Sequence, residues 1–80
     1  MNNFDMVIAT FKNLMAIEVQ KQELMKMHLD ALEKVAKEDE PLMSVGALMF
    51  RTLYNDQSKS VESMKGTLQN YIKMKEIHEE

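Results

Sequence analysis

The chain has 80 residues, enough for one domain (1–80), and 45% of them are hydrophobic, which excludes an intrinsically disordered chain. Ten basic and thirteen acidic residues give a net charge of −3, and both signs are interleaved, so the basic face that nucleic acids require is missing. Without cysteine there are no disulfides or thiolate metal sites. No apolar run approaches the roughly 18 residues of a membrane-spanning helix, and no basic segment precedes Asp5 to mark a cleavable secretion signal.

A first helix is predicted over residues 3–37. Asn2 or Asn3 can cap it, and Asp5 places a carboxylate at the favourable end of the helix dipole. One sector of a 3.6-residue helical wheel contains Val7, Phe11, Leu14, Met25, Leu29, Leu32 and Ala36. Outside that sector lie Ile8, Val19, Leu24, Met27 and Val35. We therefore expect more than one face of this helix to meet protein.

Pro41 is the only proline, and it predicts the turn between two helices. It disfavours helical geometry at Glu40 and suits the first turn of a new helix. A second helix is predicted over residues 42–77, with apolar residues at steps of three and four. The fold class is therefore all-α, a two-helix antiparallel hairpin. So short a hairpin leaves much apolar surface exposed unless copies of itself or a partner complete the core.

The polar segment 55–60 is either a loop that divides the second helix or part of that helix. It contains neither Gly nor Pro and no capping box, so we favour the continuous helix. The first helix has its own polar stretch at a comparable distance from the turn. In a hairpin Glu18, Lys21 or Gln22 could then meet Asp56, Gln57 or Lys59. Such a polar layer fixes the register of the two helices at some cost in stability.

No residue pattern in the chain is typical of catalysis, of a metal site or of a cofactor site. His28 and His78 have no carboxylate or second histidine one helical turn away, so neither predicts a catalytic pair or a metal site. Met25 and Met27 point in nearly opposite directions on a helix and cannot chelate one ion. The nine methionines are better explained as adaptable contact surface, part of it between chains. Gly46 and Gly66 fit either a close backbone approach or simple drift.

The second helix contains a spaced set of polar and apolar residues, Tyr54, Asn55, Gln57, Ser58, Val61, Met64 and Lys65. At these positions it resembles the second helix of type III secretion needle subunits. Residues 31–37 followed by Pro41 are similar to the end of that family's first helix and its turn. From Pro41 to Tyr54 the chain is about one helical turn shorter than the family pattern, and Gly66 stands where the family usually has Asp.

This resemblance implies a subunit that polymerises into a hollow filament for protein export, at the cell surface or secreted. The implied packing residues are Phe11, Leu14, Leu32, Leu53, Val61, Met64, Leu68 and Ile72. The implied polar residues of the lumen or of subunit contacts are Asn55, Gln57, Ser58, Glu62 and Lys65. The alternative is a cytoplasmic helical binding, inhibitory or chaperone-like protein that acts as a dimer or on one protein partner.

Overall fold

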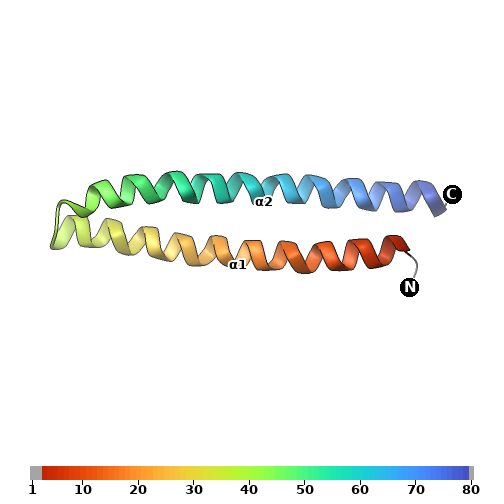
Figure 1. Cartoon of the computed structure of the whole chain (residues 1–80), viewed down its shortest axis with the longest axis horizontal. Helices are drawn as coiled ribbons and strands as arrows, with labels where there is room; N and C mark the ends of the chain where they lie inside the picture. The colour runs from red at the N-terminus through yellow and green to blue at the C-terminus, as the bar shows by residue number, and fades with distance from the viewer. Residues whose placement is uncertain (1–2, 80) are drawn as a thin grey trace.

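The computed structural model describes residues 3–79, which form two long antiparallel helices joined by a short turn (Figure 1). Helix α1 spans Asn3–Glu38 and α2 spans Met43–Glu79, and the chain measures 61 × 17 × 11 Å. The predicted all-α hairpin is confirmed. Asn2, one of the two predicted caps, lies outside the described residues, while Asn3 is itself the first residue of α1.

The turn forms at Pro41, as predicted. The Glu40 amide donates to the Val35 carbonyl over 2.9 Å and closes the end of α1. The Glu40 side chain accepts a hydrogen bond from the Leu42 amide over 3.2 Å, and its carbonyl accepts one from the Met43 amide over 2.9 Å. Glu40 therefore caps α2, and Pro41 takes the first position after the cap, where its missing N–H costs nothing.

The two helices contact each other along a seam with alternating steps of three and four residues. On α1 the buried and half-buried seam residues are Phe4, Ile8, Phe11, Met15, Glu18, Gln22, Met25, Leu29, Leu32 and Ala36. On α2 they are Ala47, Phe50, Tyr54, Gln57, Val61, Met64, Leu68, Tyr71 and Lys75. Leu29 and Val61 are the most deeply buried, with 2% and 3% of their surface exposed. This period of 3.5 residues is that of a left-handed coiled coil.

The wheel sector predicted for α1 was wrong at two positions. Val7 and Leu14 are exposed, whereas Ile8 and Met15 are half-buried in the seam. A 3.6-residue wheel drifts by about 20° per heptad relative to a 3.5-residue seam, so a fixed sector cannot follow the contact line along so long a helix. The segment 55–60 is helical throughout, which confirms the continuous second helix.

Candidate functional site

Four residues, Glu18, Gln22, Gln57 and Ser58, form a polar level that interrupts the apolar seam near the middle of the rod. Gln57 is only 8% exposed, and its Nε2 atom donates to the Glu18 carbonyl oxygen over 3.1 Å and to Glu18 Oε2 over 2.6 Å. Gln22 Nε2 donates to Ser58 Oγ over 3.0 Å. Within the described residues, no buried side-chain polar atom lacks a partner. The level is therefore satisfied inside one chain, and it aligns the helices because a register shift would break these bonds.

The predicted meeting of the two polar stretches is confirmed for Glu18 and Gln57. Lys21, Asp56 and Lys59 are instead exposed, and Gln22 contacts Ser58, which is not one of the residues predicted for this layer.

The polar residues assigned by the needle resemblance fall into two groups. Gln57 and Ser58 take part in the polar level between the two helices. Asn55, Glu62 and Lys65 are exposed on α2, and Lys65 Nζ donates to Glu62 Oε1 over 3.1 Å. Only this second group is accessible to a lumen or another subunit while the hairpin stays intact.

The packing residues of the resemblance also divide by position. Those buried or half-buried are Phe11, Leu32, Val61, Met64, Leu68 and Ile72. Leu14 and Leu53 are 57% and 56% exposed. The hairpin itself therefore occupies most of this set, and only these two leucines offer most of their surface to another chain.

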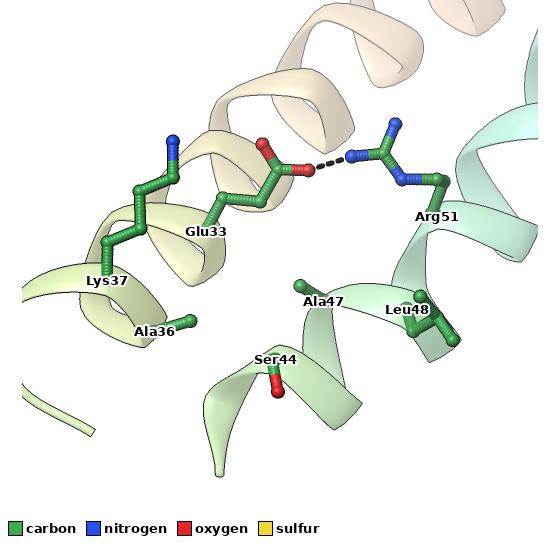
Figure 2. Close-up of a pocket in the computed structure, with 7 residues that line it drawn as sticks. All are labelled: Glu33, Ala36, Lys37, Ser44, Ala47, Leu48 and Arg51. Atoms are coloured by element: carbon green, nitrogen blue, oxygen red, sulfur yellow. Dashed lines mark hydrogen bonds and ion pairs between the residues drawn. The ribbon is translucent and has the colours of Figure 1, made fainter. Parts of the chain in front are cut away.

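The hairpin has two sides that differ in chemistry, and grooves near the turn define them. The Arg51 side carries a groove lined by Glu33, Ala36, Lys37, Ser44, Ala47, Leu48 and Arg51 (Figure 2). In that view Glu33 of α1 and Arg51 of α2 point toward each other and form an ion pair across the groove. The opposite side, the His28 side, carries a groove lined by His28, Leu32, Gly46, Met49, Phe50 and Leu53. Near the turn the Arg51 side is therefore charged, and the His28 side is mostly apolar.

The turn end of the hairpin exposes apolar side chains on more than one side. This turn-end segment, residues 42–53, buries Ala47 against α1 and exposes Leu42, Met43, Val45, Leu48, Met49 and Leu53. Leu42 is 76% exposed and Leu48 71%. Apolar side chains that point in several directions from a helix are normally covered by protein. The sequence carries this signal, but a pattern of three- and four-residue steps alone does not separate these residues from the seam.

The chain exposes more surface than a compact protein of its size. Its accessible surface is 6125 Å², whereas a compact monomer of this mass exposes about 5,000 Å². The excess, about 1,100 Å², is larger than the roughly 800 Å² that each partner buries in a standard protein interface. The excess counts polar and apolar surface together, and among the described residues it includes Leu42, Leu48 and Ile77, which are at least 70% exposed.

Two ion pairs link the helices, one near each end of the rod. Glu33 pairs with Arg51 near the turn, and Lys75 Nζ lies 2.6 Å from Asp5 Oδ1 near the termini. The hydrogen bond to Asp5, followed by the charge of its carboxylate, raises the pKa of Lys75 above 10.5. Because these side chains are partly exposed, the pairs guide alignment more than they stabilise the fold.

The two histidines lie against aromatic rings. The ring centres of His28 and Phe50 are 4.6 Å apart, and those of His78 and Phe4 are 4.9 Å apart. Among residues 3–79 no three side chains of the kinds that bind metals gather into a cluster. Across the same residues, neither helix has a stretch long and apolar enough to cross a bilayer.

No protein-family model, curated protein or solved structure matches the chain significantly. The resemblance to needle subunits therefore remains a prediction. The fold and the surface define a coiled-coil hairpin that exposes apolar side chains along α1 on its His28 side and at its turn end.

Proposed function

We propose that the chain is a non-enzymatic assembly subunit that covers its apolar surface with further copies of itself. The observation that carries this proposal is the surface excess of about 1,100 Å² over a compact monomer, which exceeds one partner's share of a standard interface. Burial of apolar surface is the main driving force for protein association. The polar level and two ion pairs already align the helices, so association need not rebuild the hairpin.

The turn-end segment supports an assembly larger than one closed pair. Its exposed side chains point to several sides of α2, and Leu48 lies on the Arg51 side whereas Leu53 lies on the His28 side. A single flat contact covers only one of these directions. When two different surfaces of neighbouring copies meet head to tail, the contact repeats and produces a ring or an open filament.

The finer proposal is a hollow filament for protein export, at the cell surface or secreted, as in the needle subunits that the second helix resembles. Asn55, Glu62 and Lys65 are exposed and would supply polar groups to the lumen. A polar wall suits the passage of varied unfolded chains because it offers no continuous apolar surface to which they would stick.

The second candidate is a cytoplasmic binding or inhibitory protein that covers the same surface with one different protein. The contrast between the apolar His28 side and the charged Arg51 side favours it, because a one-sided apolar hairpin fits a single complementary groove. Its signature would be a stoichiometric complex with one heterologous protein and no polymer.

Light scattering over a wide concentration range, combined with electron microscopy, tests the proposal. We expect an average mass that rises with concentration above the 9.3 kDa of one chain. Leu48→Gln should reduce the largest assemblies with little change in helix content, because Leu48 is 71% exposed and lies outside the seam. Met27→Gln is the matched control, since Met27 is 66% exposed on α1 and lies in neither groove. Particles of one chain at every concentration would refute self-assembly.

A further inference from the structure

A second apolar stripe runs along the outside of α1 on the His28 side. Val7, Leu14, Lys21 and Val35 lie at multiples of seven residues from His28, so in a heptad structure they share its side. Thr10, Ile17, Leu24 and Ala31 fall between them and complete steps of three and four. Every member is exposed. The stripe thus repeats the spacing of the seam on an exposed flank of α1, which is typical of a helix that packs against a second partner.

The matching stripe of α2 has a different size pattern. It begins near the turn with Gly46, Met49 and Leu53, which share the groove with His28. The same heptad positions then continue as Asp56, Ser60, Ser63, Thr67 and Asn70, and end with Met74 and Ile77. The middle of the α2 stripe is therefore polar, with small residues at Ser60 and Ser63, whereas the middle of the α1 stripe is large and, apart from Lys21, apolar.

Contacts across the seam show which residues of the two stripes lie at the same height along the rod. Phe11 contacts Tyr71 with ring centres 5.3 Å apart, and Glu18 contacts Gln57. Ile17 of α1 thus lies near the level of Ser63 of α2. By the same register Leu14 lies near Thr67, and Lys21 lies near Asp56.

Lys21 and Asp56 are the only charged residues of the two stripes. Within the described part of the chain neither forms an ion pair. A second copy can pair them if its α1 lies over the first copy's α2. That happens when the two copies run in parallel about a two-fold axis along the rod. Ile17 of each copy then meets the small residues around Ser63 of the other.

We propose that two copies of this chain pair in parallel through their His28 sides, with Lys21 of each copy against Asp56 of the other. The result is a four-helix bundle in which every α1 has an α2 on two sides. This pairing rests on the proposed self-association and would be the contact that joins the first two copies. The surface excess of about 1,100 Å² per chain exceeds the roughly 800 Å² per partner that such a contact needs. Leu48 and Val45 stay outside this contact and are left for further assembly.

Cysteine crosslinking tests the pairing directly, because the chain has no native cysteine. We expect Ile17→Cys and Ser63→Cys chains, mixed under oxidising conditions, to form a disulfide between copies. An antiparallel pair would instead bring Ile17 near Leu24 of the other copy, so a disulfide in the Ile17→Cys and Leu24→Cys mixture would overturn the proposal. Glu23→Cys with Asn55→Cys, both on the Arg51 side, is the control that should stay uncrosslinked.

Charge reversal gives an independent readout of the same contact. Lys21→Asp or Asp56→Lys alone should weaken dimerisation about 2- to 30-fold, because each dimer contains two copies of the pair. The double reversal should restore the wild-type dissociation constant. At concentrations too low for association the melting curves should change little, since neither residue pairs within its own chain. Double and single variants of equal affinity would overturn the contact.

The outcomes separate this inference from the proposed function. A chain that stays monomeric refutes both. A chain that associates without the Ile17–Ser63 crosslink keeps the function and rejects this pairing.

Discussion

Replacing Gln57 by Leu tests whether the polar level holds the two helices together in the observed register. Gln57 is 8% exposed, and its Nε2 atom lies 2.6 Å from Glu18 Oε2. Leu would leave the half-buried Glu18 carboxylate without this donor, which costs about 1–3 kcal/mol. For a domain of this size each kcal/mol shifts Tm by about 4–8 °C. We therefore expect Tm to fall by at least about 4 °C.

The matched variant replaces Glu18 and Gln57 together by Leu. Because an apolar pair of similar volume needs no hydrogen bond, it should be as stable as the natural pair or more stable. We also expect the helices to slip more easily, since nothing polar then fixes their register. The double variant should thus have a higher free energy of unfolding than the value obtained by adding the changes caused by the two single substitutions.

Thermal and urea unfolding followed by circular dichroism would measure these changes. All variants are compared at one protein concentration, because association raises apparent stability. A Gln57→Leu variant that melts at or above the wild-type temperature would refute the reasoning. So would additive effects of the two single changes, because a direct contact produces coupling.

Three further changes probe the seam, the outer surface and the terminal ion pair. Leu29→Ala should lower the free energy of unfolding by about 2–5 kcal/mol, measured by urea titration, because Leu29 is the most buried side chain. Gly66→Ala should raise it by up to about 1 kcal/mol, since an added Cβ meets nothing within 4 Å and Ala favours the helix; a loss would point to a neighbouring backbone. Lys75, whose pKa is raised above 10.5 by Asp5, should stabilise the fold at neutral pH and lose this contribution as the pH rises through that pKa; melting curves of Asp5→Asn should lack this alkaline loss.

The hairpin could be predicted from the sequence because its signals are local. One proline, two uninterrupted helical periods and charged ends determine where each helix starts and stops. The seam was harder to predict. A 3.6-residue wheel places Leu14 in the buried sector, but Leu14 is exposed and the neighbouring Met15 lies in the seam. Only the supercoil, which depends on both helices at once, determines which of the two is covered.

The polar level shows the same limit at the scale of single atoms. The comparable distances of two polar stretches from Pro41 predicted that they would meet, and Glu18 with Gln57 was among the pairs expected. The pairing of Gln22 with Ser58 depends on rotation of α2 about its axis, which no pattern along one helix reports. The candidate surface was foreseen only as apolar residues off the seam. Its division into two sides needed the relative orientation of both helices.

Both ends of the described chain lie at one end of the rod, and the turn lies at the other (Figure 1). A fluorescent protein or affinity handle attached before Asn3 or after Glu79 would thus leave from the same place, with most of the 61 Å length between it and Leu48. Such labels would leave the turn end of the rod unobstructed, whereas a bulky insertion at Pro41 would block it. If only the insertion at Pro41 prevents assembly, copies associate through their turn ends; if neither change prevents it, they pair along their sides.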